Sequence, residues 1–111
     1  MDVMFISKLR KPDAMDDATF YAIWEKEAKT AIASLDAGRM KFMFKVAGRY
    51  ELIGIMSVDE PEQIDDIIHS LPIWKEGYMH IVEDYQWYIL SDYRQWAKKL
   101  SSLAKNAAKD N

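Results

Sequence analysis

Residues 40–58 read MKFMFKVAGRYELIGIMSV, two runs of alternating side chains on either side of the turn Ala47-Gly48-Arg49. The first run places these side chains on one face: Met40, Phe42, Phe44 and Val46. The second run does the same with another set: Tyr50, Leu52, Gly54, Met56 and Val58. Two such runs around a short turn predict an antiparallel hairpin. The glycine inside the second strand predicts a bulge or the close approach of a ligand or another backbone.

Before the hairpin, the chain predicts one strand and one long helix. Residues Val3–Leu9 alternate as a strand does. Asp16 is the expected N-cap of a helix that ends at Gly38, a residue typical of the C′ position.

After the hairpin, Asp59 is the expected cap of a second helix, which Pro72 ends. Residues 78–89 are rich in aromatic side chains and predict a fourth strand. A third helix follows a cap at Ser91 or Asp92. Its apolar stripe consists of Tyr93, Trp96, Leu100, Leu103 and Ala107. We expect this helix to dock on the domain through Trp96 and Leu100, with its basic side chains in solvent.

This order predicts an α+β fold: a ferredoxin-like β-α-β-β-α-β domain over residues 1–90, followed by a C-terminal helical extension over residues 91–111. Helices cover one face of such a sheet, and here several strands are apolar on both faces. The uncovered face therefore predicts a partner, and a second copy packed face to face would supply one.

Composition excludes several classes of protein. The 111 residues are 50% hydrophobic, which favours one folded domain, and the net charge of −3 gives no reason to bind nucleic acid or a membrane surface. The chain has no cysteine, and its two histidines and scattered acids lack metal-site spacing, so we expect no metal. We recognise no signal peptide and no spanning segment, and expect a cytoplasmic protein.

Glu27 is the most informative single residue. In the helix that begins after Asp16, it falls roughly 20° from Phe20, on the apolar stripe. A carboxylate that faces a core is costly to ionise, so its pKa should rise, which suits proton transfer near neutral pH. The alternative interpretation is a glutamate at the edge of the stripe that reaches water or pairs with a lysine.

Several strings of residues resemble the muconolactone Δ-isomerase family. They are Phe44-Lys45-Val46-Ala47-Gly48-Arg49-Tyr50, Val58-Asp59, Leu71-Pro72-Ile73-Trp74 and Tyr78-Met79-His80-Ile81. The likeness runs without gaps from Met1 to about Pro72 and fades after about Val82. It implies a dimeric α/β barrel, a homodimer or a larger homo-oligomer, and an isomerase that uses no cofactor.

The same resemblance implies site residues. Glu27 matches the family's acid/base glutamate, and Tyr50 matches the tyrosine that begins the third strand. Leu52 stands where the family has an asparagine that polarises the substrate. This departure favours a more apolar ligand than muconolactone.

Aromatic and sulfur-containing side chains are candidates to line a substrate pocket, with core packing or a dimer interface as the alternative. With Leu52 and His80, the predicted substrate-binding set is Trp24, Phe42, Phe44, Leu52, Met56, Trp74 and His80. His80 lies where the family has an acid, and an ordinary strand histidine is its alternative interpretation.

The sequence therefore predicts a cofactor-independent isomerase or cyclase. It would act on a small apolar carbonyl compound, such as an unsaturated lactone or enone, by proton transfer through Glu27. The alternatives are a cofactor-free monooxygenase, a haem enzyme in which His80 is the ligand, and a non-catalytic protein that binds a hydrophobic ligand.

Overall fold

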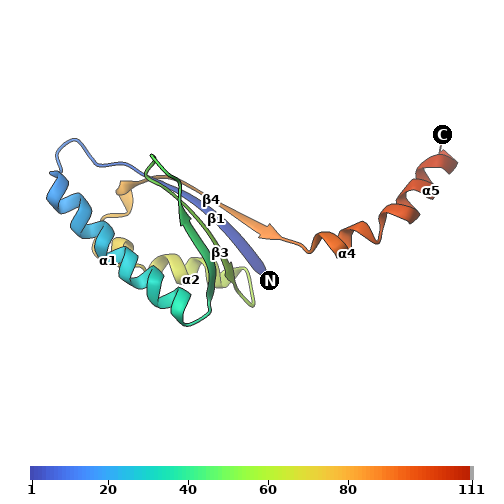
Figure 1. Ribbon diagram of the computed structural model, residues 1–111, viewed down its shortest axis with the longest axis horizontal. Coiled ribbons are helices and arrows are strands. Elements are labelled where there is room, and N and C mark those ends of the chain that lie inside the picture. The colour runs from blue at the N-terminus through green and yellow to red at the C-terminus, as the bar shows by residue number, and fades with distance from the viewer. Residues whose placement is uncertain (111) are drawn as a thin grey trace.

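Four strands and two main helices form the body of the protein, and the computed structural model describes residues 1–110, with side chains through Lys109 (Figure 1). The strands are β1 (Asp2–Leu9), β2 (Met40–Lys45), β3 (Glu51–Ser57) and β4 (Val82–Leu90). The helices are α1 (Asp17–Asp36), α2 (Glu62–Ser70), α3 (Pro72–Lys75), α4 (Tyr93–Ala97) and α5 (Leu100–Asp110).

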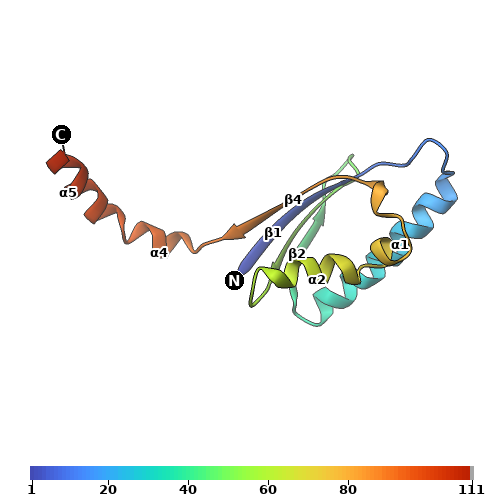
Figure 2. The ribbon, with the colours of Figure 1, turned by 180° about the vertical axis from the view of Figure 1, so that it is seen from behind.

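The sheet is antiparallel with strand order β2-β3-β1-β4. Helices α1 and α2 lie on one side of it, and no helix of residues 1–110 covers the other side (Figures 1 and 2). This arrangement confirms the predicted α+β, ferredoxin-like fold.

Both ends of α1 follow from local sequence. The Asp16 carboxylate accepts a hydrogen bond from the Thr19 amide at 2.7 Å, as an N-cap does. At the other end, Gly38 has φ of 81° and its amide donates to Leu35 O, while the Arg39 amide donates to Ser34 O. These two bonds form a Schellman motif, which requires a residue in the left-handed region and explains the glycine.

The predicted hairpin is present, but its first strand does not keep strict alternation. The register shifts between Met40, which pairs with Met56, and Phe42, which pairs with Ile55. An extra residue in β2 therefore reverses the facing of the later residues of the strand. The prediction that Phe42 and Phe44 share a face with Met40 is wrong for this reason.

The register defines two faces. We call the face toward the helices the cavity face; it carries Val3, Phe5, Ser7, Met40, Met43, Leu52, Gly54, Met56, Tyr85 and Trp87. We call the opposite one the open face; it carries Met4, Ile6, Phe42, Phe44, Ile53, Ile55 and Tyr88. Both sets are largely apolar.

The structure gives a reason for a glycine at position 54 that the sequence did not predict. It pairs with Phe5 across the strands, and a Cβ at this position would overlap the Phe5 ring at Cε1 and Cζ. The glycine accommodates an aromatic side chain of the neighbouring strand, so neither a bulge nor a close backbone lies at this position.

The segment between β3 and β4 differs from prediction in three details. Asp59 does not cap α2 through its side chain; instead the Gln63 Oε1 accepts from the Asp59 amide at 2.6 Å. Pro72 ends α2 but also begins the short helix α3, since proline fits the first helical position. A 3₁₀ turn over Met79–Ile81 delays the start of β4 to Val82.

The buried side chains form two separate clusters rather than one continuous core. One consists of Val3, Met40, Met56 and Val58, and the other of Phe20, Ile73 and Ile81. The interior between them is hollow, and this hollow is the candidate site.

Residues 91–110 form an arm that leaves the body at the end of β4 (Figure 1). The Asp92 carboxylate caps α4 by accepting from the Arg94 amide at 2.7 Å, as predicted. The prediction of one helix docked through Trp96 and Leu100 is wrong: the chain breaks at Lys98–Lys99, and those two side chains are 47% and 45% exposed. The arm raises the radius of gyration to 18.7 Å, against about 13 Å for a compact chain of this length.

Candidate active site

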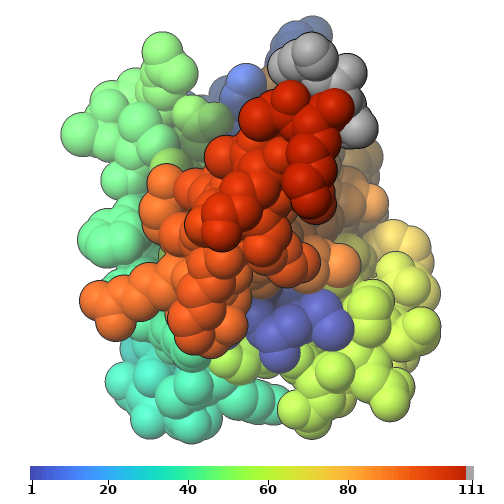
Figure 3. All heavy atoms as spheres, turned by 90° about the vertical axis from the view of Figure 1, so that its right-hand side faces the viewer, coloured from blue at the N-terminus to red at the C-terminus, as the bar shows by residue number. Residues whose placement is uncertain are grey.

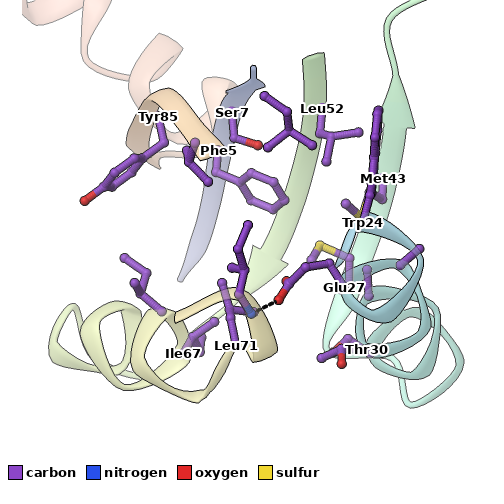
Figure 4. A pocket seen from close by; sticks show the side chains of 18 of the residues that line it. Phe5, Ser7, Trp24, Glu27, Thr30, Met43, Leu52, Ile67, Leu71 and Tyr85 are labelled. Atoms are coloured by element: carbon purple, nitrogen blue, oxygen red, sulfur yellow. Dashed lines mark hydrogen bonds between the residues drawn. The ribbon is translucent and has the colours of Figure 1, made fainter. Parts of the chain in front are cut away.

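A cavity of about 550 Å³ lies between the cavity face of the sheet and the helices beneath it. Figure 4 shows Phe5, Ser7 and Leu52 extending into the cavity from the strands, and Trp24 and Glu27 extending from α1. The far wall comes from Ile67 and Leu71. The volume of this cavity is in the range of cavities that hold small organic ligands.

Glu27 is the acidic residue that lines this cavity, and no other acid does so within residues 1–109. Its side chain is half-buried, and its Oε1 accepts a hydrogen bond from the Ile73 amide (Figure 4). Ile73 is the second residue of α3, so the carboxylate also caps the N-terminus of that helix. One side chain thereby joins α1 to α3 across the cavity.

Burial raises the pKa of the Glu27 carboxyl above its ordinary value of 4.5. The hydrogen bond from Ile73 opposes this shift by favouring the charged form, and the nearby Glu76 carboxylate adds to it. The desolvation of the carboxylate is the largest of the three influences. The prediction that this carboxyl has a raised pKa agrees with these surroundings.

The remaining polar side chains of the cavity are few. Ser7 extends from β1 and Thr30 from α1, and Tyr85 stands on β4 near the rim (Figure 4). Lys45 also borders the cavity, but its ammonium donates to Val46 O at 3.2 Å and lies 5.9 Å from the centroid of the Tyr50 ring. Apart from these groups, Ser34 and the Trp87 indole, the lining around Glu27 is apolar.

The structure brings together only part of the predicted substrate-binding set. Trp24, Leu52 and Met56 line the cavity with Glu27. Phe44 borders it, although its register belongs to the open face and it is 64% exposed. Because the register places the Phe44 side chain outward, we assign it to the rim.

Three members of that set lie elsewhere. Phe42 is on the open face and 55% exposed because of the register shift in β2. Trp74 is exposed on α3, with its ring 4.6 Å from that of His69. His80 is exposed on the 3₁₀ turn before β4 rather than within a strand, which removes it from the cavity wall.

Tyr50, the second predicted catalytic residue, is also outside this cavity. Its hydroxyl shares a 2.5 Å hydrogen bond with the Tyr21 hydroxyl, and its ring packs on Phe20 and Trp24. It lines a separate shallow depression with Lys8, Arg49 and Glu83. The tyrosine stacks behind the cavity wall and does not face Glu27.

Sequence reasoning missed Phe5, Ser7 and Met43 as cavity residues. For Ser7 a signal existed, since it is the polar member of the otherwise apolar set Val3, Phe5 and Leu9. For Met43 no local signal existed, because its direction depends on the register shift at β2.

The site offers no obvious place for a metal ion. Among residues 1–109, no three His, Asp or Glu side chains come close enough to hold one. Within the same described range, none of the helices combines the length and apolar character that crossing a membrane requires.

A comparison with protein families identifies the family to which this chain is similar. The family model described as muconolactone delta-isomerase matches residues 1–83, which include β1 and the start of β4. No curated protein sequence matches this chain significantly.

Two solved structures share the fold. A muconolactone isomerase crystal structure matches with a TM-score of 0.67 and 20% identity, covering 83% of this chain and 90% of that one. A 5-chloro-2-hydroxyhydroquinone dehydrochlorinase from Burkholderia phenoliruptrix AC1100, in complex with 2,5-dihydroxybenzoquinone, matches with a TM-score of 0.50 and 11% identity. That match covers 80% of this chain and 93% of the other. At such identities the likeness is one of fold alone.

Proposed function

The chain belongs to the muconolactone delta-isomerase family, and from that premise we propose that it is a cofactor-independent isomerase of small unsaturated carbonyl compounds. The observation that carries the proposal is the Glu27 carboxylate in the wall of an apolar cavity. A half-buried carboxyl with a raised pKa is a candidate for proton transfer near neutral pH.

In the proposed reaction, the Glu27 carboxylate removes a proton from a carbon α or γ to the substrate carbonyl. The electron pair of the broken C–H bond enters the conjugated system and forms a dienolate. The protonated Glu27 then returns the proton to a different carbon, and the C=C bond shifts. The substrate and product have the same atoms, so the step needs no oxidant or cofactor. A raised pKa of the carboxyl reduces the difference between its pKa and that of the substrate C–H bond. This smaller difference favours proton transfer in both directions.

The dienolate oxygen needs a hydrogen-bond donor, and we assign this role to the Ser7 hydroxyl. Ser7 pairs across the sheet with Leu52, the residue at the position where the resembling family has an asparagine. Both side chains face the cavity (Figure 4). The hydroxyl therefore lies beside the position of the missing amide; Lys45 pairs with Leu52 from the other side, but its ammonium donates to Val46 O. Tyr50 has no part in the proposed mechanism, because its hydroxyl bonds to Tyr21.

The cavity favours an uncharged substrate. A carboxylate-bearing ligand would need a cation beside it, and Lys45 directs its ammonium toward Val46 O at the rim. The walls around Glu27 come from Phe5, Trp24 and Leu71. These side chains suit a ring or chain of hydrocarbon attached to the lactone or enone.

We also propose that the protein acts as a homodimer. The open face exposes Phe42 and Phe44, and no described element of the chain covers it. A large apolar face of this kind is typical of an interface. A second copy packed against it would remove both side chains from water.

Proton transfer can be tested directly in D₂O. Purified protein is incubated with a panel of unsaturated lactones and enones, and NMR follows the exchange of C–H for C–D and the shift of the double bond. The wild-type protein should exchange the α or γ proton of at least one compound, and the Glu27→Gln variant should not. Equal exchange by both proteins would contradict the mechanism.

A second function, binding of an apolar ligand without chemistry, is favoured by one observation. The Glu27 carboxylate already has a structural task, the capping of α3 through the Ile73 amide. In a carrier protein this would be its whole task. A ligand that binds tightly and is recovered unchanged, with no deuterium incorporated, would favour the carrier.

A further inference from the structure

Trp87 carries a polar atom for which the folded chain provides no partner. It lies on β4, on the cavity face of the sheet, and borders the cavity. Its Nε1 is buried and has no hydrogen-bond partner. Among the non-exposed residues of the described range 1–109, it is the one buried side-chain nitrogen or oxygen in that condition. The N–H of a buried tryptophan usually has an acceptor, because an unpaired buried donor destabilises the fold.

Residues 1–109 bring no acceptor to this nitrogen. The arm of residues 91–110 follows β4 directly, but α4 and α5 make no extensive contact with the sheet. In Figure 3 the arm stands forward of the body toward the viewer. An acceptor for the indole N–H therefore comes from outside the described chain, and the cavity is the space that the indole borders.

Neighbouring side chains hold the indole in place. Phe5 pairs with Trp87 across the strands, with 5.3 Å between the two ring centroids, and pairs with Gly54 on its other side. The indole also packs against the buried cluster that contains Met40 and Met56. Both methionines border the cavity, and methionine side chains are flexible. The wall around the indole is thus able to adapt to a ligand, whereas the ring itself is packed on Phe5.

The indole lies beside the donor already assigned to the reaction. Ser7 pairs with Tyr85, two residues before Trp87, so Ser7 and Trp87 are diagonal neighbours on one sheet face, about 7–8 Å apart. Glu27 is bonded to Ile73, which belongs to the other buried cluster. The three side chains therefore border one cavity, with two donors on the sheet and the carboxylate on α1.

We propose that the Trp87 N–H binds a second oxygen of the substrate, in addition to the carbonyl oxygen that Ser7 binds. The substrate class is then cyclic unsaturated compounds with acceptor oxygens at two separate ring positions, such as enediones and oxo-lactones. The indole nitrogen only donates, so a carbonyl or ether oxygen suits it. An analogue with CH₂ in place of that oxygen leaves the donor unpaired and binds more weakly. This inference rests on the proposed occupant of the cavity, an uncharged unsaturated carbonyl compound, and not on the role of Glu27.

A matched pair of compounds tests the donor: isophorone, a cyclic enone, and 4-oxoisophorone, which has a carbonyl in place of one ring CH₂. NMR titration of ¹⁵N-labelled protein gives the dissociation constant of each compound for wild type and for Trp87→Phe. The quantity compared is the ratio of the constant for isophorone to that for the dione. This ratio should fall about tenfold in Trp87→Phe, the effect of one hydrogen bond. An unchanged ratio would overturn the proposal.

Two further variants separate the N–H from the packing of the ring. Trp24→Phe, which trims another indole of the cavity wall, should weaken both compounds alike and leave the ratio unchanged. An equal fall of the ratio in Trp24→Phe would overturn the assignment to Trp87. Replacement of Trp87 by β-(3-benzothienyl)alanine keeps the bicyclic ring, with sulfur where the N–H stands. The ratio should fall in this protein as it does in Trp87→Phe, and a wild-type ratio would overturn the proposal.

The indole signals of the NMR spectrum give a direct readout. The chain has four tryptophans, and the signal that Trp87→Phe removes belongs to Trp87. Its N–H proton should move downfield when 4-oxoisophorone binds and move little with isophorone, because only the dione supplies the second acceptor. A Trp87 signal that neither compound moves would overturn the proposal. If that signal moved with protein concentration instead, the acceptor would belong to a second copy, and the proposal would again be wrong.

Deuterium exchange separates this inference from the proposed isomerisation. Isophorone has protons α and γ to its carbonyl, and their exchange in D₂O should need Glu27 but not Trp87. Exchange by wild type with an unchanged ratio in Trp87→Phe would overturn the second donor alone. A fall in the ratio without exchange would support the donor and overturn the isomerase in favour of a carrier. If neither compound bound, the proposed class of occupant would be wrong, and this inference with it.

Discussion

On the cavity face of the sheet, Phe5 and Leu52 look onto a hollow closed by α1 and α2, whereas on the open face Ile6 and Phe42 have no described element above them. The two faces are similar in apolar character and differ in what the chain places opposite them. Opposite the first stands Glu27, a carboxylate held by the Ile73 amide. An apolar sheet face can therefore bind either a ligand or another protein. The groups that lie opposite the face determine whether it serves catalysis or association.

The largest expected effect concerns the carboxylate of the cavity face. We expect Glu27→Gln to lower kcat by about 10²–10⁴-fold, the usual contribution of a general acid/base. The amide oxygen can still accept from Ile73, so the urea midpoint should change little. Glu27→Ala is the control that leaves the Ile73 amide unpaired, at a cost of about 1–3 kcal/mol. Full turnover in Glu27→Gln would show that the Glu27 carboxylate has no catalytic role in the cavity.

The next effect concerns the open face. Phe42→Ser with Phe44→Ser should weaken self-association by at least about a hundredfold, because burial of each phenylalanine side chain contributes about 1.5–3 kcal/mol. Sedimentation equilibrium measures the change. Lys41→Ser, a change in the same strand outside the apolar set, is the matched control. An unchanged dissociation constant would show that the open face is not the interface.

The third effect concerns the packing of side chains on the cavity face. Gly54→Ala should lower the free energy of unfolding by about 1–3 kcal/mol, since the new methyl group meets the Phe5 ring. Adding Phe5→Leu should recover part of this loss by removing the ring. Chemical denaturation of the two single variants and the double variant measures the coupling, and strictly additive losses would contradict the proposed contact.

A smaller effect tests the donor on the cavity face. Ser7→Ala should lower kcat by about 3–10-fold with little change in KM, which corresponds to roughly 1 kcal/mol for one hydrogen bond made mainly to the dienolate. Thr30→Val serves as the control for loss of a cavity hydroxyl on the helix side. A greater loss in Thr30→Val would assign the donor to α1 instead.

The smallest effect is the pH dependence of stability. Because burial raises the pKa of Glu27 above 4.5, the folded chain holds this proton more tightly than the unfolded chain does. The stabilisation that this carboxyl contributes is therefore complete below about pH 4.5 and is lost as the pH rises through the raised value. Urea unfolding measures the free energy of unfolding of wild type and of Glu27→Gln between pH 4 and 8. As the pH rises, this free energy should fall more steeply for wild type than for the variant, and parallel pH profiles would contradict the raised pKa.

The sequence by itself determined the features that depend on neighbouring residues. The caps at Asp16 and Asp92, the left-handed turn at Gly38 and the order of strands and helices arise from contacts within a few positions. Glu27 also belongs here, because its place on the apolar stripe follows from the helical repeat alone.

Only the tertiary structure decided which apolar residues enclose the cavity and which remain outside. The register shift in β2 turns Phe42 outward, and the pairing of the Tyr50 and Tyr21 hydroxyls occupies the predicted second catalytic group. Likewise, Ile73 contacts Glu27 from 46 positions away, and the described part of the arm makes no extensive contact with its own body. These outcomes depend on contacts between distant segments, and alternation or helical spacing carries no information about which distant segment will stand opposite a given side chain.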